Sequence, residues 1–260
     1  MRFSSTWHFI LFGFLIAAAM NAPFYAWIYD KPWDWAHGFP IGWMAASLST
    51  MSTFFHELGH TALAWFYGYP TIPIFDFTHG GGFAISVSGQ NYMILGGVYI
   101  GLGYLIYLLR AFRGLQIAVG ALILFHLATA FNEDFRHNVI DFMGPGVEPL
   151  IAGFLLTRAL LDLAPRGALE RLLNAVFGFA MLISTLIRGF ALIKNDAYRM
   201  VYFQQKGTHG FGDFDKIEER ISFMDFQAVV SVWIALSILC LVLPFIIAFF
   251  DKFSEEEETI

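Results

Sequence analysis

The feature that most constrains this chain is a series of mostly apolar runs, each close to the length that crosses a lipid bilayer. A bilayer core takes about 20 residues of α-helix. Runs of that order cover residues 7–29, 41–67, 91–109, 115–131, 147–162, 171–193 and 226–250. They are continuous rather than alternating with a period of two, which favours helices over barrel strands. The sequence predicts an all-α fold, a polytopic transmembrane bundle of about six or seven helices in a single domain, 1–260.

Composition supports a membrane protein and excludes other classes. The 260 residues are 57% hydrophobic and only 14% charged, which is unlike a soluble domain. The net charge of −6 comes partly from an acidic tail, 251–260, and no basic cluster is present, so nucleic acid is not an expected partner. We expect a multi-pass protein of a plasma (inner) membrane, whose partners are the lipid bilayer and a membrane-protein substrate or partner subunit.

Two segments depart from the apolar pattern. A polar stretch at about 194–225 is too short for a core of its own and is predicted to be a loop with one amphipathic helix near 214–223. After the stop signal Gly68-Tyr69-Pro70, residues 75–78 and 83–88 alternate apolar with small or polar side chains. That alternation predicts a small β-hairpin, either re-entrant beside a site or lying at the surface.

The second apolar run, 41–67, contains His56-Glu57-Leu58-Gly59-His60, an HExxH motif. On a helix, side chains four residues apart lie on one face, so His56 and His60 can bind one metal ion. Glu57 then lies beside that metal, where a carboxylate can accept a proton from a bound water. The motif predicts a Zn²⁺ site with His56 and His60 as ligands and Glu57 as the catalytic residue.

A catalytic zinc usually takes three protein ligands, so another side chain must contribute. We predict Asp141 first, because it precedes an expected helix break at Gly144-Pro145-Gly146, and broken membrane helices often carry ligand sites. His137 is the second choice and Glu148 the third. Other ionisable groups in or near apolar segments are Asp76, His79, His126, Glu133 and Asp134. A helix over 126–141 would align several of them, whereas a solvated surface loop over 132–141 is the alternative.

Other interpretations of the same residues remain open. In one alternative, His56 and His60 bind no metal and form interhelical hydrogen bonds instead, although this does not account for Glu57. A lone buried histidine such as His126 is more typical of a hydrogen-bonded core residue. The protein can also be a non-catalytic metallopeptidase-like subunit or scaffold of a larger membrane complex, or a metal transporter, which would need ligands along a path.

From about Thr53 to Phe83 the chain resembles the site-2 protease family of intramembrane zinc metalloproteases. The resemblance rests on the HELGH motif, the apolar remainder of its helix, Gly68-Tyr69-Pro70 and the glycine-rich hairpin. It implies hydrolysis of peptide bonds in or near the transmembrane segments of membrane proteins, and an N-terminus on the cytosolic side. The family's third ligand is an aspartate followed by glycine, whereas Asp141 is followed by Phe142.

Overall fold

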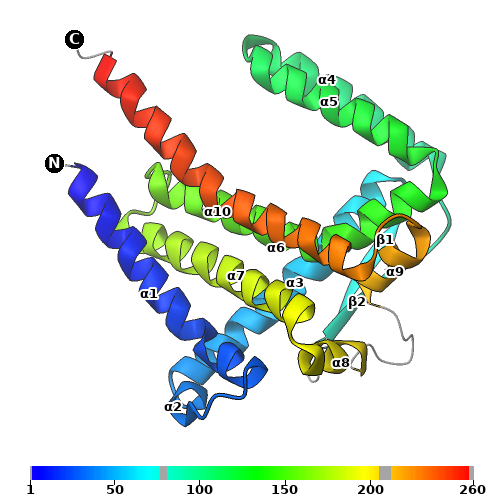
Figure 1. The fold of residues 1–260 in the computed structure, drawn as a ribbon. Coiled ribbons are helices and arrows are strands. Elements are labelled where there is room, and N and C mark those ends of the chain that lie inside the picture. Colours follow the sequence, from blue (N-terminus) through cyan, green and yellow to red (C-terminus); the bar gives the residue numbers. More distant parts are fainter. Residues whose placement is uncertain (1, 77–80, 205–211, 258–260) are drawn as a thin grey trace. The chain divides into compact units, whose positions relative to one another are not determined.

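The computed structural model describes residues 2–76, 81–204 and 212–257, with side chains described from residue 6 to residue 251. This part of the chain forms ten α-helices and one antiparallel hairpin (Figure 1). The elements are α1 (Arg2–Ile28), α2 (Asp34–His37), α3 (Ile41–Phe66), β1 (Thr71–Asp76), β2 (Gly81–Ser86), α4 (Tyr92–Leu108), the 3₁₀ turn η1 (Leu109–Ala111), α5 (Arg113–Ala130), α6 (Glu133–Leu160), α7 (Ala168–Lys194), α8 (Asp196–Gln204), α9 (Asp213–Arg220) and α10 (Phe226–Glu257).

Six of the described helices are long and apolar enough to cross a membrane, namely α1, α4 with η1, α5, α6, α7 and α10. The predicted all-α transmembrane fold with a small hairpin is therefore confirmed, and the protein is a multi-pass membrane protein. Helix α3 has 26 residues but is not among the six. Its serines, threonines, two histidines and one glutamate keep the hydropathy of every 18-residue stretch of α3 below that of the best stretch in each of the six spans.

The contacts divide the chain into two compact units. The first unit comprises 1–52, 145–212 and 224–260, and the second comprises 53–144 and 213–223. Helices α3 and α6 contribute residues to both units. The first unit is held by α7, which packs against α1 and α10. Small residues permit this approach, since a methyl group added to Gly13 would lie 2.5 Å from the Cβ atom of Ala175.

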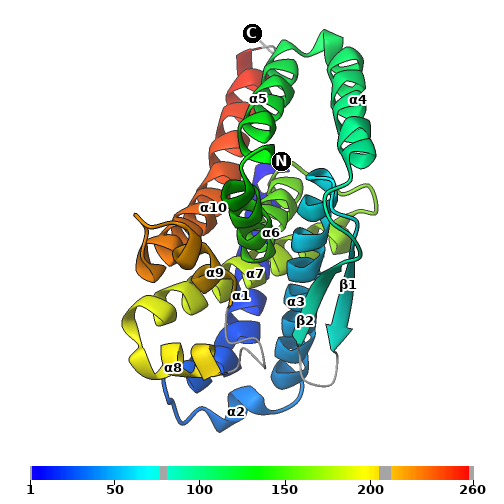
Figure 2. The ribbon, with the colours of Figure 1, turned by 90° about the vertical axis from the view of Figure 1, so that its right-hand side faces the viewer.

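The second unit contains the C-terminal part of α3, the β-hairpin, α4, α5, the first part of α6, and α9. Helix α3 ends as its sequence predicts. The Tyr69 N–H donates to Ala64 and the Gly68 N–H to Trp65, the paired bonds of a Schellman motif. Gly68 has φ +83°, which glycine adopts without steric cost. The chain then turns into β1, and Figure 2 shows the hairpin alongside α3.

Strands β1 and β2 pair over six residues each, from Thr71 opposite Ser86 to Asp76 opposite Gly81. The stacked rings of Phe54 and Phe75, with centroids 5.2 Å apart, pack β1 against α3. The predicted hairpin is thus present, although β1 begins four residues before the alternation and β2 begins two residues before it and ends at Ser86. Its turn, and with it the candidate His79, falls outside the described residues.

His126 is a core residue of the second unit. Its ring is fully buried, with Nε2 3.1 Å from the Phe66 carbonyl oxygen and Nδ1 2.9 Å from the Tyr99 hydroxyl. Because a carbonyl only accepts, Nε2 carries the proton and Nδ1 accepts from the tyrosine. One side chain of α5 therefore joins α3 to α4, and the hydrogen-bonded core interpretation of His126 is confirmed.

Two predictions about 126–148 are wrong. The helix expected over 126–141 is interrupted at Phe131 and Asn132. Helix α6 also continues without a break through Gly144-Pro145-Gly146, where a break was expected. Residues 133–141 are helical, so the surface-loop alternative also fails.

Prolines persist in membrane helices when neighbours satisfy the carbonyls they leave free. Pro149 has no N–H for the Pro145 carbonyl, and the indole Nε1 of Trp233 donates to that oxygen instead at 2.8 Å.

Candidate metal centre

The two histidines of the HExxH motif face the same point in the second unit. They are four residues apart on α3, one turn of the helix, so their rings lie one above the other. Their Nε2 atoms are 3.2 Å apart and their ring centroids 4.9 Å apart. The motif thus forms a two-nitrogen site on one face of α3.

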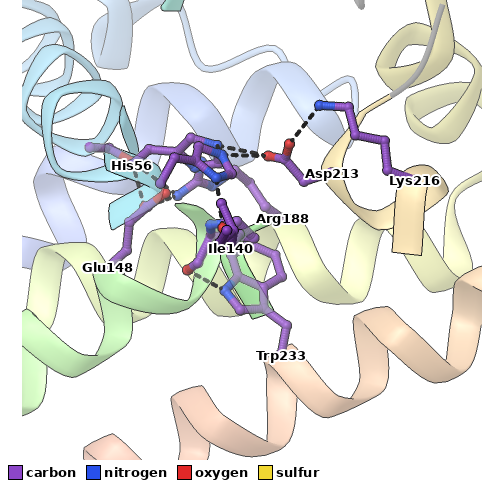
Figure 3. Close-up of polar contacts among 10 residues, drawn as sticks. His56, Ile140, Glu148, Arg188, Asp213, Lys216 and Trp233 are labelled. Carbon is purple, nitrogen blue, oxygen red and sulfur yellow. Dashed lines mark hydrogen bonds and ion pairs between the residues drawn. The ribbon is translucent and has the colours of Figure 1, made fainter. Parts of the chain in front are cut away.

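A third group approaches from α9, more than 150 residues later in the sequence. The Asp213 Oδ2 atom lies 2.9 Å from His56 Nε2 and 3.2 Å from His60 Nε2 (Figure 3). The Asp213 side chain is 18% exposed and the His60 side chain 11% exposed. Among the described residues, these three form the one group of histidine, cysteine and carboxylate side chains close enough to hold a metal ion.

The backbone of α6 determines how His60 presents its nitrogens. Its Nδ1 atom lies 2.9 Å from the carbonyl oxygen of Ile140, which can only accept, so Nδ1 carries the proton. In a neutral ring, Nε2 then has a free lone pair directed at His56 and Asp213. A carbonyl that fixes the tautomer in this way is typical of metal-binding histidines.

Gly144 gives His60 room on the same helix. A methyl group added to Gly144 would lie 2.1 Å from His60 Nε2, much closer than a Cβ atom approaches an atom to which it is not bonded. A glycine is therefore required where α6 passes this ring.

The electrostatics of the group centre on Asp213. Burial alone would raise the pKa of its carboxyl group, but the hydrogen bonds and the positive charge that His56 and His60 supply when protonated together outweigh burial and hold the pKa well below its ordinary value. Lys216 lies one turn further along α9, with Nζ 3.4 Å from Asp213 Oδ1. Asp213 is thus held as a carboxylate, the form that binds metal ions.

Glu57 lies beside this cluster and is 5% exposed. Strand β2 covers it so closely that a methyl group on Gly82 would lie 2.6 Å from the Glu57 Cγ atom. The charges of His56, His60 and Asp213 all act on the Glu57 carboxyl group. The structure therefore gathers both histidines and the glutamate of the motif at one place.

The predicted third ligands lie in other environments. Arg220 of α9 forms an ion pair with the Asp141 carboxylate, and its Nη1 atom is 3.4 Å from Asn138 Oδ1. The His137 ring packs near the Tyr69 ring, with centroids 5.7 Å apart. Asp141 as a ligand stays a prediction, while the structure places Asp213, which the sequence did not single out, beside the histidines.

The cluster fits zinc by donor type and spacing. Two imidazole nitrogens and one carboxylate oxygen are ordinary zinc ligands. Bonds of about 2.0–2.1 Å to a tetrahedral ion place ligand atoms about 3.3 Å apart. The three atoms here are separated by 2.9–3.2 Å, so a small outward movement would admit the ion.

No family model, no curated protein and no solved structure matches this chain, so the assignment of the site rests on its own geometry.

Proposed function

We propose that this protein is an intramembrane zinc metalloprotease of the site-2 protease type, embedded in a plasma (inner) membrane. The observation that carries the proposal is the convergence of His56, His60 and Asp213, with Glu57 beside them. His56 and His60 would hold the metal through Nε2, and Asp213 would supply the third ligand. Asp141 would then act indirectly, through Arg220.

The roles of the side chains follow from their chemistry. A bound zinc ion would acidify a water molecule and polarise a peptide carbonyl. Glu57 would accept the proton from the attacking water and return it to the leaving amine. Burial beneath β2 leaves Glu57 only 5% exposed, so the carboxylate would exchange protons with the reacting groups rather than with bulk water.

The hairpin offers a place for an extended substrate. Within the described residues β2 pairs only with β1, so its other edge has unpaired backbone groups. Peptides commonly bind by adding a strand to such an edge. Because Gly82 of β2 contacts Glu57, a substrate strand paired there would pass close to the proposed acid/base. We propose the transmembrane segments of other membrane proteins as substrates, since these must unwind locally before cleavage.

The proposal is tested by combining zinc analysis with proteolysis of a panel of membrane-protein segments by the purified chain. We expect Glu57→Gln to retain zinc and to lose cleavage, because it removes only the acid/base. A wild type that holds zinc but cleaves no segment would instead favour a non-catalytic subunit of a membrane complex. A Glu57→Gln variant that cleaves as fast as the wild type would overturn the assigned role.

A further inference from the structure

The first unit contains a cavity that has no part in the proposed peptidase chemistry. It has a volume of about 360 Å³ and lies among α1, α2, α3 and α7. That volume is within the usual range for small-molecule sites, about 300–1,000 Å³. Apolar side chains of α1, including Met20, Phe24 and Trp27, line one part of the wall, and Ser52, Ser184 and Arg188 line another. The lining therefore combines apolar side chains with polar ones, which also include Asn21 and His37.

The polar part of the lining is built around a charged side chain on a membrane-spanning helix. Arg188 of α7 donates from Nη2 to Glu148 Oε2 at 2.5 Å and to Ser52 Oγ at 3.2 Å (Figure 3). The indole of Trp233 covers its guanidinium group, with the Arg188 carbon Cζ 5.7 Å from the ring centroid. Ionisable groups within membrane-spanning segments are costly and usually mark a functional site.

Arg188 retains hydrogen-bonding capacity. A guanidinium group has five N–H donors, two of them on Nη2. Among the described residues, neither Nε nor Nη1 has an acceptor, and Nε is buried. The side chain is nevertheless 24% exposed. Unmet donors in a low-dielectric site favour an acceptor that enters the cavity.

The charge balance selects the kind of acceptor. Glu148, which is 2% exposed, already offsets the charge of Arg188, so every negative charge that a ligand adds is uncompensated and a dianion costs more than a single carboxylate. A single carboxylate adds one charge and matches the donors of a guanidinium group. The neighbouring apolar wall suits the first methylene groups of a hydrocarbon tail.

We propose that this cavity binds the carboxylate headgroup of a membrane amphiphile, of the fatty-acid class. The carboxylate accepts hydrogen bonds from Arg188, and the start of the chain lies among Met20, Phe24 and Trp27. The site does not depend on zinc, so it stands or falls separately from the proposed peptidase activity.

The test measures binding of radiolabelled dodecanoate to the full chain in phosphatidylcholine nanodiscs, with empty nanodiscs as background. We expect about one dodecanoate per chain, displaced by unlabelled dodecanoate but neither by dodecanol nor by acetate at the same concentration. His56→Ala should bind as the wild type does. Equal displacement by dodecanol would overturn the role of the carboxylate, and displacement by acetate would overturn the role of the tail.

Two variants link binding to the cavity. Ala45→Phe fills the space without touching the ion pair and should abolish saturable binding, whereas Ala46→Phe on the exposed face of the same helix should not. The double variant Glu148→Gln/Arg188→Gln removes both charges together and should weaken binding at least about tenfold, since a hydrogen bond to a charged group contributes about 1.5–3 kcal/mol. Unchanged binding in Ala45→Phe would overturn the proposal.

Discussion

At the scale of single residues, two glycines give the candidate site its shape. Gly144 faces the His60 ring and Gly82 faces the Glu57 side chain, each at a distance that excludes a methyl group. The motif itself was readable from the sequence, because His56 and His60 must share a helix face. The need for these two glycines could not be predicted from the sequence, because it arises from contacts between elements that are far apart in the chain.

We predict that Gly82→Ala lowers peptidase activity about 10–100-fold while zinc content is unchanged. The added methyl group must displace Glu57, and small displacements of a catalytic group cost rates of that order. Gly81→Ala is the matched control, because a methyl group there meets no atom within 4 Å. Equal activity of the two variants would show that β2 does not position Glu57.

Gly144→Ala should reduce zinc affinity by about 10–100-fold, the loss typical when a ligand's supporting contacts are disturbed. The methyl group would lie within 2.7 Å of three atoms of the His60 ring and must displace the ring from its present position. Gly120→Ala on α5 meets no atom within 4 Å and controls for the general cost of substitution. Competition with a chromogenic zinc chelator measures the affinity, and full affinity in Gly144→Ala would contradict the geometry of this site.

At the scale of elements, the short helix α9 completes the cluster. Its buried residues Phe214 and Ile217 face inward, Asp213 at its start reaches the histidines, and Arg220 at its end binds Asp141 of α6. An amphipathic helix in this segment was predictable from its sequence. The position of this helix was not predictable. The polar stretch was interpreted as a solvated loop, and no local sequence feature indicates which distant charged groups its aspartates contact.

We predict that the Asp141–Arg220 pair positions α9 and so controls metal affinity without binding the metal. Arg220→Gln and Asp141→Asn should each weaken zinc binding about tenfold, since each leaves a partly buried charge unpaired. The exchange Asp141→Arg/Arg220→Asp should recover part of that loss. If Asp141 were itself a ligand, Asp141→Asn would lose the metal, Arg220→Gln would keep it, and the exchange would recover nothing.

At the scale of the whole molecule, continuous apolar runs were enough to predict a multi-pass helical protein. Each described span overlaps a predicted run, because backbone groups in lipid must be satisfied within the segment, although α6 begins at Glu133, well before the run 147–162. The main error was the helix break expected near Pro145, and a hydrogen bond from a distant side chain to the backbone explains it. The Gly144-Pro145-Gly146 sequence predicts a helix break, yet α6 continues through it. The Trp233 indole donates to the Pro145 carbonyl oxygen, which Pro149 cannot do because it has no N–H.

Helix α3 determines the topology. Its 26 residues extend about 39 Å, enough for the roughly 30 Å core of a bilayer. We predict that α3 crosses the membrane as a seventh span despite its polar residues, which places the two termini on opposite sides. Reporters active on only one side of the membrane, fused to either end of the full chain, test this directly. Termini on the same side would mean that α3 does not cross.

We propose that His56, His60 and Asp213 together hold one zinc ion. Elemental analysis of the purified chain, prepared without chelators, tests it most directly in the wild type and in the variants His56→Ala, Asp213→Asn and Glu57→Gln. We expect about one zinc per chain in the wild type and in Glu57→Gln, and little zinc in His56→Ala and Asp213→Asn. A wild type without zinc, or full zinc content in Asp213→Asn, would contradict it.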